Sequence, residues 1–372
     1  MKSNYKTIGD LVERIDEKNS DGQIDELIGV SINKCFIKSV ANTIGTDLTK
    51  YKIIRKNHFA VSLMQVSRDA KIPIACLKDY DAAIMSPAYS IFRVKDCKEV
   101  LPDYLDLWFK RSEFDREAAF IAVGGVRGSM PWEEFCRIQV LVPTLEEQTR
   151  IVNEYNAIAN RIELKKQIND NLLATAQAVF KSWFIDFDMN NGECPTNWNT
   201  GCVEDIAELY DSMRKPLSSM ERAGMERTYP YYGAVSIVDY VEDYIFDGEY
   251  LLVSEDGIYV VDDNGHPLLQ HVTGKFWANN HAHILKGKAG FNEDSLYLFL
   301  ANTNMSPIVT GAAQPKINQA NLKSFPILIP DAKTLKEFNR LIEPLFDQRL
   351  SNEAEIKNLE TLKELLLTRL VA

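Results

Sequence analysis

The chain has 372 residues, of which 45% are hydrophobic and 26% charged, a composition typical of a soluble globular protein rather than a disordered or fibrous one. No apolar run approaches the roughly 18 residues of a membrane-spanning helix, and none follows the start, so we expect neither an anchor nor a signal peptide. The six cysteines are scattered without metal-binding spacing, which indicates reduced thiols in a cytoplasmic protein.

The net charge of −11 is distributed unevenly along the chain. Residues 1–143 hold 21 basic and 20 acidic side chains, whereas residues 190–330 hold 9 and 18. Within the first block, residues 33–78 carry nine Lys or Arg against only Asp47 and Asp69. Such a concentration of cations favours contact with DNA phosphates, although a merely solvated basic face is the alternative. The acidic second block can bind DNA only through a few well-placed cations.

The first block predicts a mixed α+β fold. Short β-type runs at 27–31, 51–54, 59–63 and 90–94 alternate with turn residues. A helix over 102–120, a loop at 124–131, a short helix and a strand to Val142 follow. Residues 8–12 align with residues 203–207, which open the second block.

Residues 145–187 predict one long amphipathic helix, with Pro143 and Thr144 as a stop-and-cap signal. Its polar interruptions are Lys165 and Asn169. A seam this long fits a partner helix better than a globular core. Its apolar positions recur at steps of four and three residues and include Ile151, Tyr155, Ile158, Ile162, Leu172, Ala176, Val179 and Trp183.

A shift of 187 residues produces a second copy of this helix, which ends the chain. Pro143 falls on Pro330, and Pro344 predicts a kink or a late start. The chain is therefore an internal duplication, with predicted segments 1–143, 144–189, 190–330 and 331–372. An intramolecular antiparallel pair is favoured over a homodimeric coiled coil or a docking rod for another protein. The second seam is Phe338, Ile342, Leu345, Ile356, Leu359, Leu366 and Leu370, with Arg349, Asn352 and Lys363 as polar steps.

The second block repeats the α+β plan. It predicts an aromatic turn at 229–234, strands at 248–254, 257–261 and 281–285, and a helix at 296–300. The loop at 311–318 is the counterpart of the loop at 124–131. Each loop combines small residues, which allow close backbone approach, with one cation, Arg127 or Lys316.

The sequence offers little for catalysis. Phosphate-binding, nucleophile-elbow and zinc-protease motifs are absent, and there is no Pro-Pro dipeptide for an amino-methyltransferase motif. His281 and His283 share a strand face, with His266 or His271 as a third ligand, but a polar strand face is favoured over a metal site. We expect no enzyme activity, metal or cofactor in this chain.

The candidate DNA contacts are polar and basic. The cations of the first block suit phosphates, Gln314 suits adenine, and Arg127 suits guanine or a phosphate. The tyrosines are either core or contact residues, and the paired asparagines either turn residues or base readers. The full set is Asn33, Lys34, Lys50, Lys52, Arg55, Lys56, Arg68, Lys71, Arg127 and Ser129 in the first block, and Arg214, Lys215, Tyr231, Tyr232, Asn279, Asn280, His281, Gln314 and Lys316 in the second.

Several segments resemble the specificity subunit of type I restriction–modification enzymes, namely residues 29–34, 45–52, 84–89, 142–148, 231–234, 247–257, 279–283 and 311–316. The resemblance implies two target-recognition domains, each reading one half of a bipartite DNA sequence, in a chain without catalysis of its own. It implies helices that set the gap between the halves and dock two methyltransferase subunits. S-adenosylmethionine and Mg/ATP are then expected on partner subunits, which include a restriction motor. The alternative is a protein–protein scaffold or inhibitor that reads no DNA.

Overall fold

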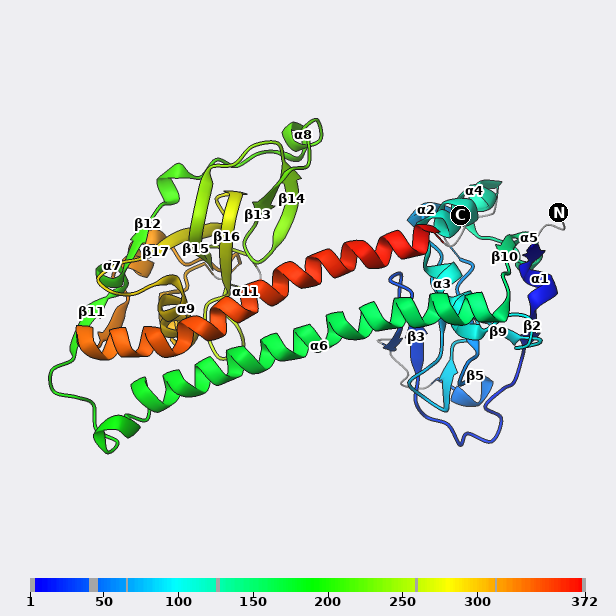
Figure 1. Ribbon diagram of the computed structural model, residues 1–372, viewed down its shortest axis with the longest axis horizontal. Coiled ribbons are helices and arrows are strands. Elements are labelled where there is room, and N and C mark those ends of the chain that lie inside the picture. Colours follow the sequence, from blue (N-terminus) through cyan, green and yellow to red (C-terminus); the bar gives the residue numbers. More distant parts are fainter. Residues whose placement is uncertain are drawn as a thin grey trace. The chain divides into compact units, whose positions relative to one another are not determined.

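The computed structural model describes residues 4–39, 46–64, 66–124, 128–257, 260–311 and 313–369. The chain forms two compact units, residues 1–164 with 355–372 and residues 165–354. Each unit combines sheets and helices with part of both long helices, which agrees with the predicted α+β class (Figure 1). The predicted segments, by contrast, divide the chain at the ends of the long helices. That division remains a prediction about function.

The first block is built on an antiparallel sheet with the strand order β2-β9-β6-β7. Its core is aromatic: Phe59 stacks on Phe92, and Phe109 meets both rings edge-on. The strands are β1 Tyr5–Thr7, β2 Val12–Ile15, β3 Ile28–Val30, β4 Phe36–Lys38, β5 Lys52–Arg55, β6 Phe59–Val61, β7 Ile74–Cys76, β8 Ala82–Met85, β9 Ser90–Val94 and β10 Gln139–Leu141. The helices are α1 Ile8–Leu11, α2 Val66–Asp69, α3 Pro102–Lys110, α4 Ser112–Ile121 and α5 Trp132–Arg137.

The helix predicted over 102–120 is two helices, because Arg111 adopts an extended conformation between α3 and α4. The guanidinium carbon of Arg111 lies 4.3 Å from the centre of the Trp108 ring, and Arg111 is only 4% exposed. A cation–π contact of this kind stabilises the turn between the helices. The periodicity alone gives no sign of this break.

The second block contains one mixed sheet with the order β12-β17-β15-β16-β13-β14. The predicted aromatic turn at 229–234 is wrong, because residues 229–232 form strand β13 between β14 and β16. Of the predicted strand 257–261, residues 258 and 259 lie outside the described residues, and the others contribute only an isolated bridge at Val261. The strands are β11 Asn199–Cys202, β12 Ala207–Leu209, β13 Tyr229–Tyr232, β14 Ile237–Val241, β15 Phe246–Ser254, β16 Leu269–Ala278, β17 Ala282–Gly287 and β18 Pro326–Ile329. The helices are α7 Val203–Ile206, α8 Ser219–Arg222, α9 Glu293–Ala301 and α10 Gln319–Lys323.

The two blocks share one topology. The order β2-β9-β6-β7 in the first corresponds to β12-β17-β15-β16 in the second. Strand β1 pairs with β10 as β11 pairs with β18, so that Thr7 faces Gln139 and Cys202 faces Pro326. Each pairing leads into a short helix with a capping box, closed by Asp10 in α1 and by Asp205 in α7. The duplication detected in the sequence is thus present in the strand connections.

The long helices are α6, Leu145–Phe184, and α11, Ala332–Arg369, whose first residues differ by the predicted 187 positions. In the second unit, Phe180 contacts Phe338 while Asn169 bonds Asn352. In the first unit, Arg161 forms an ion pair with Glu355. In the second unit, rising numbers on α6 therefore meet falling numbers on α11, which confirms the predicted antiparallel arrangement (Figure 1).

The seam positions are buried or half-buried wherever the structure describes them, and Leu370 lies outside the described residues. Helix α6 ends at Phe184 rather than 187, because Phe187 adopts a left-handed conformation with φ +53°. Of the two outcomes predicted from Pro344, a kink or a late start, the late start is wrong, since α11 begins at Ala332 and continues through the proline. Phe184, which the seam omitted, is buried against Phe299.

The described part of the chain includes no helix with the length and apolarity to cross a membrane. All six cysteines are free thiols.

Candidate nucleic-acid interface

Several predicted cations of the first block lie on its surface. Lys56 and Lys71 are exposed and have no ion pair among the described residues. Lys50 pairs with Asp47 at 3.3 Å, Arg68 with Asp69 at 2.8 Å, and Arg55 with Glu17 at 2.5 Å. Exposed pairs of this kind contribute about 0–1 kcal/mol each, so a phosphate can replace the carboxylate at little cost. These five cations, with the exposed Asn33 and half-buried Ser129, remain candidate contacts.

For two other lysines of this block, burial contradicts the predicted contact with DNA. Lys34 is 8% exposed, and its ammonium group bonds the carbonyl of Phe109 and lies 2.8 Å from Oδ1 of Asp115. Burial lowers the pKa of Lys34, although the hydrogen bond to Asp115 and its negative charge act to raise it. Lys52 is also 8% exposed and donates to the carbonyl of Tyr89 at 3.0 Å. Neither ammonium group is free to reach a phosphate, so the prediction of DNA contact is wrong for both.

The predicted DNA contact is also wrong for two residues of the second block. Tyr231 is 1% exposed, and its hydroxyl accepts a hydrogen bond of 2.9 Å from the backbone N–H of Leu217. Asn279 is 8% exposed, and its side-chain oxygen accepts from the N–H of His281 at 2.8 Å. The first is a core residue and the second a turn residue. The next residue in each case remains a candidate contact: Tyr232 is half-buried and Asn280 is exposed. The exposed Lys215 also remains a candidate.

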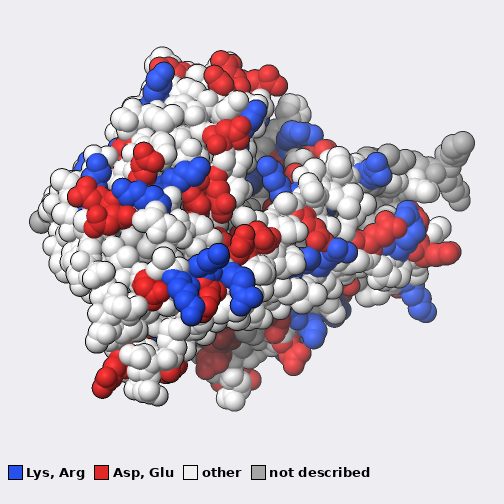
Figure 2. Space-filling model, turned by 60° about the vertical axis from the view of Figure 1, so that its left-hand side comes forward, with Lys and Arg blue, Asp and Glu red and all other residues white. Residues whose placement is uncertain are grey.

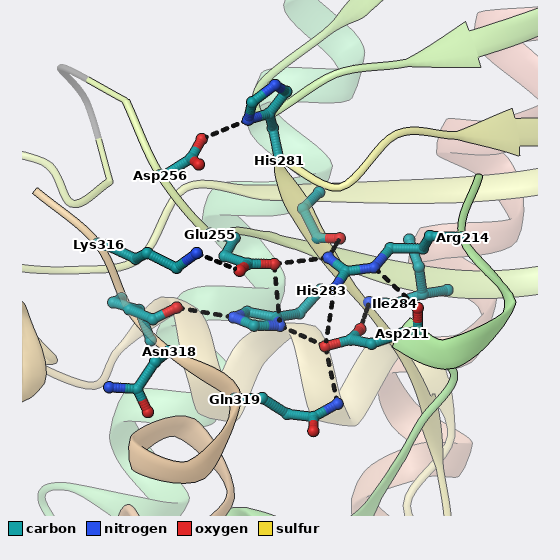
Figure 3. A network of polar contacts seen from close by, with 12 residues as sticks. Asp211, Arg214, Glu255, Asp256, His281, His283, Ile284, Lys316, Asn318 and Gln319 are labelled. Carbon is teal, nitrogen blue, oxygen red and sulfur yellow. Dashed lines mark hydrogen bonds and ion pairs between the residues drawn. The ribbon is translucent and has the colours of Figure 1, made fainter. Parts of the chain in front are cut away.

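Arg214 and Lys316 meet in a network of charged side chains at one end of β15 (Figure 3). Glu255, the first residue after this strand, accepts from Nη1 of Arg214 at 2.6 Å and from Nζ of Lys316 at 2.8 Å. Arg214 also donates to the carbonyl of Ala282 at 2.6 Å. The predicted DNA contact of Arg214 is wrong, because its side chain is only 12% exposed and joins Glu255 to β17. Lys316 is 44% exposed and remains a candidate.

His283 forms the interior of the same network. Its Nδ1 lies 2.6 Å from Oδ2 of Asp211, and its Nε2 lies 2.8 Å from the carbonyl of Ile317. Asp211 also accepts from the side-chain amide of Gln319 at 2.9 Å, at the start of α10. Because a carbonyl can only accept, Nε2 carries the proton of its hydrogen bond. The network thus ties β17 to the loop before α10.

The carboxylates of the network are held ionised. Burial acts to raise the pKa of Glu255, but hydrogen bonds from Lys316 and Arg214 outweigh it and lower the pKa. Burial likewise acts to raise the pKa of Asp211, but the hydrogen bonds from His283 and from the backbone N–H of Ile284, together with the charge of Arg214, lower it overall. The hydrogen bond to Glu255 in turn raises the pKa of Lys316. The two carboxylates and Lys316 are therefore charged at neutral pH.

The loop that carries Gln314 is closed at its base. Thr310 and Lys316 exchange two backbone hydrogen bonds of 2.8 Å, and Ala312 lies outside the described residues. Gly311 has φ +85°, and a Cβ there would lie 2.4 Å from the carbonyl oxygen of Gln314, so only glycine fits. The loop exposes the Gln314 side chain at its tip while Lys316 fixes its base to Glu255. The corresponding cation of the first block, Arg127, lies outside the described residues.

Sequence reasoning missed Asp211, Glu255, Gln319 and the inward role of His283. The spacing of Asp211 and Arg214 and the acidic pair Glu255–Asp256 after a strand were available signals. His281, by contrast, is 47% exposed and bonds Asp256 at 2.6 Å, so it remains a candidate contact. The two histidines of this strand therefore have different surroundings, since His281 lies at the surface beside Asp256 and His283 lies inside the network beside Asp211.

Asp211, Glu255 and His283 could also be read as a metal site, since their ligand atoms lie within 4.8 Å of one another. The donor set does not fit, because Arg214 and Lys316 already neutralise these carboxylates and would repel a cation. Across the second block, Figure 2 shows basic and acidic side chains intermixed on the face drawn rather than one continuous basic area. Any DNA contact here depends on individual side chains.

Comparison with known proteins extends these observations. Residues 195–361 match the family model described as type I restriction modification DNA specificity domain. A type I restriction enzyme specificity subunit of Haemophilus influenzae is 36% identical over 143 residues, 38% of this chain and 36% of that protein. The MjaIX specificity subunit of Methanocaldococcus jannaschii is 23% identical over 301 residues, 73% of this chain and 68% of that protein.

Among solved structures, the fold is similar to that of the type I restriction–modification S subunit from M. genitalium. The TM-score is 0.58 at 13% sequence identity, and the match covers 98% of this chain and 95% of the other. At this identity the similarity concerns the fold. It includes both blocks and both long helices.

Proposed function

Because this chain is similar in sequence and in fold to type I restriction–modification specificity subunits, we propose that it is the sequence-reading subunit of such an enzyme. Each globular block reads one half of a bipartite DNA target. The long helices set the unspecific gap between the halves and dock two methyltransferase subunits.

The observation that carries the proposal is the repeated sheet topology. The orders β2-β9-β6-β7 and β12-β17-β15-β16 give two blocks of one kind, and each is followed by a long helix of matching length. A reader of a two-part sequence requires two similar binding modules joined by a spacer of fixed length. Separate divergence of the surface loops gives each module its own half-site, since sequence is read by base-edge contacts and phosphates only position.

The second block binds DNA through few groups in this proposal. Its candidates are Gln314 and Lys316 on the loop at one end of β15, with His281 and Asn280 on the neighbouring turn. An amide such as Gln314 can bond the N6 and N7 edge of adenine. The acidic surroundings make the affinity of this block dependent on partner subunits.

The chain itself performs no catalysis in this proposal. S-adenosylmethionine belongs to the methyltransferase subunits, and Mg/ATP to restriction motor subunits that join the complex. The complex works on DNA in the cytoplasm. The chain supplies recognition and assembly.

The test is the methylation motif of the assembled complex. The full chain is combined with a cognate methyltransferase subunit, incubated with random duplex DNA and S-adenosylmethionine, and modified adenines are mapped by sequencing. We expect one bipartite motif with a constant gap, and no methylation by either protein alone. A complex that forms without any sequence-selective binding or methylation would instead indicate a protein–protein scaffold or inhibitor.

A further inference from the structure

Three residues with metal-ligand side chains meet in the second block, apart from the network of Figure 3. Glu249 on β15 pairs with Thr273 of β16, so His271, two residues away, lies diagonally beside it on the same face. Asp294 lies in the first turn of α9. One ligand atom from each of Glu249, His271 and Asp294 lies within 4.8 Å of the others.

Asp294 has an unsatisfied oxygen. The residue is 6% exposed, and its buried Oδ1 has no hydrogen-bond partner among the described residues. The nearest ion-pair partner is Nδ1 of His271 at 3.8 Å, which is too long for a hydrogen bond. Buried carboxylate oxygens are normally paired with donors or with a cation, so this oxygen indicates a missing partner.

The surroundings of Asp294 are negative. Burial first, and then the nearby carboxylates of Glu249, Asp347 and Glu293, raise the pKa of Asp294 to about 7, against the opposite effect of His271. One imidazole cannot balance these carboxylates, particularly since its Nε2 already bonds Glu249 at 2.6 Å. Glu249 is 43% exposed and gives the cluster access to solvent.

We propose that Glu249, His271 and Asp294 bind one divalent transition-metal cation, which joins the β15–β16 hairpin to the start of α9. One imidazole and two carboxylates suit ions such as Mn²⁺, Co²⁺ or Zn²⁺, with water in the remaining positions. Ligand atoms around such an ion stand roughly 3–4 Å apart, so small side-chain movements close the site. The ion is structural and plays no part in DNA chemistry. This proposal departs from the expectation, drawn from the sequence, that the chain binds no metal.

The geometry also explains why this cluster, and not the other, is the site. Asp211, Glu255 and His283 have similar ligand types, but Arg214 and Lys316 occupy their oxygens. Among the described residues, no Lys or Arg forms an ion pair with Asp294 or Glu249, and Lys286 acts on Glu249 only through its charge. The unpaired oxygen and the excess of carboxylates are found only in the second cluster.

The experiment measures Mn²⁺ binding by the purified full chain, without DNA or partners, from the loss of the free-ion electron paramagnetic resonance signal. Mn²⁺ is chosen because thiols, including the exposed Cys35, Cys97 and Cys194, are poor ligands for it. The variants are Asp294→Asn and His271→Gln. The control is His266→Gln, a half-exposed histidine that lies beside Asp262 and outside the cluster. Thermal unfolding is recorded with and without the ion.

We expect one Mn²⁺ per wild-type chain and at least about tenfold weaker binding by both site variants. The His266→Gln chain should bind as the wild type does. Mn²⁺ should raise the unfolding midpoint only in the chains that bind it. Asp294→Asn removes an unsatisfied charge and should fold, so its loss of binding reports on the site. No binding by the wild type at millimolar Mn²⁺, or undiminished binding by Asp294→Asn, would overturn the proposal.

Discussion

Nδ2 of Asn352 on α11 donates a hydrogen bond of 2.7 Å to Oδ1 of Asn169 on α6. The two residues are 1% and 8% exposed, and they form a polar contact inside an otherwise largely apolar seam. Lys165 adds a bond of 2.7 Å to Oδ1 of Asn352. A buried asparagine pair is satisfied in one register only, because sliding either helix leaves an amide facing apolar side chains. This contact therefore specifies how the two helices align.

Replacing one asparagine should cost more than replacing both. Asn352→Leu leaves the amide of Asn169 and the ammonium group of Lys165 without this partner, and should lower the free energy of unfolding by about 1–3 kcal/mol. The double variant Asn169→Leu/Asn352→Leu should recover most of the loss, because two apolar side chains then face each other. Urea unfolding of the three chains measures this. Additive losses in the double variant would contradict a specific pair.

The buried network should make the second block sensitive to acid. Asp211→Asn should lower the free energy of unfolding by about 3–5 kcal/mol at neutral pH, because it leaves the guanidinium group of Arg214 and the imidazole of His283 buried without their carboxylate. The folded-state pKa of Asp211 is lowered, so its stabilisation is present above the unfolded pKa of about 4 and disappears as the pH falls through the folded value.

Urea midpoints of wild type and Asp211→Asn, measured from neutral pH downward, test this sign. The difference between the two chains should be constant near neutrality and should narrow in acid. Asp263→Asn, a change at an exposed carboxylate, is the matched control and should leave the midpoint unchanged. A difference that grows in acid would contradict the assignment.

Asp294 should produce the opposite pH dependence. Its pKa is raised to about 7 by burial and neighbouring carboxylates. Between about pH 4 and pH 7, the unfolded chain therefore releases this proton while the folded chain retains it, and stability falls as the pH rises. In the presence of a chelator, Asp294→Asn should flatten this decline and be more stable than the wild type at pH above about 7. An unchanged slope in the variant would show that another group causes it.

The tip of the loop at 311–316 should affect recognition without affecting stability. Gln314 is exposed, and Gln314→Ala should weaken binding to one half-site by about 1–3 kcal/mol while leaving the unfolding midpoint unchanged. Band-shift titrations of the assembled complex against DNA altered in either half measure the effect. Loss at both halves, or at neither, would remove Gln314 from the list of base readers.

Lys316→Ala tests a different mechanism in the same loop. It should reduce the salt dependence of binding by about one phosphate contact, but it also frees one oxygen of Glu255. Lys316→Arg keeps the ion pair and is the control for the structural part of the loss. If Lys316→Ala binds DNA with unchanged affinity and salt slope, Lys316 holds the loop and does not contact DNA.

The sequence by itself determined the plan of the molecule. The spacing of apolar residues predicts the long helices, because residues three or four positions apart lie on the same face of an α-helix. The 187-residue repeat predicts the duplicated blocks. Strands such as Ser90–Val94 also follow from local composition. These features depend on residues near one another in the chain, or on comparison of two similar stretches.

Only the tertiary structure decided which polar residues are available to DNA. Lys34 and Tyr231 looked like surface contacts, and their burial depends on Asp115 and Leu217, which are 81 and 14 residues away. Arg214 also has the sequence pattern of a DNA contact, but its guanidinium group is bonded to Glu255, 41 residues later. The sequence around a Lys or Arg does not show whether its charged group faces a carboxylate or solvent in the folded chain. The partner that neutralises it is set by strand pairing between distant segments, which no local pattern records.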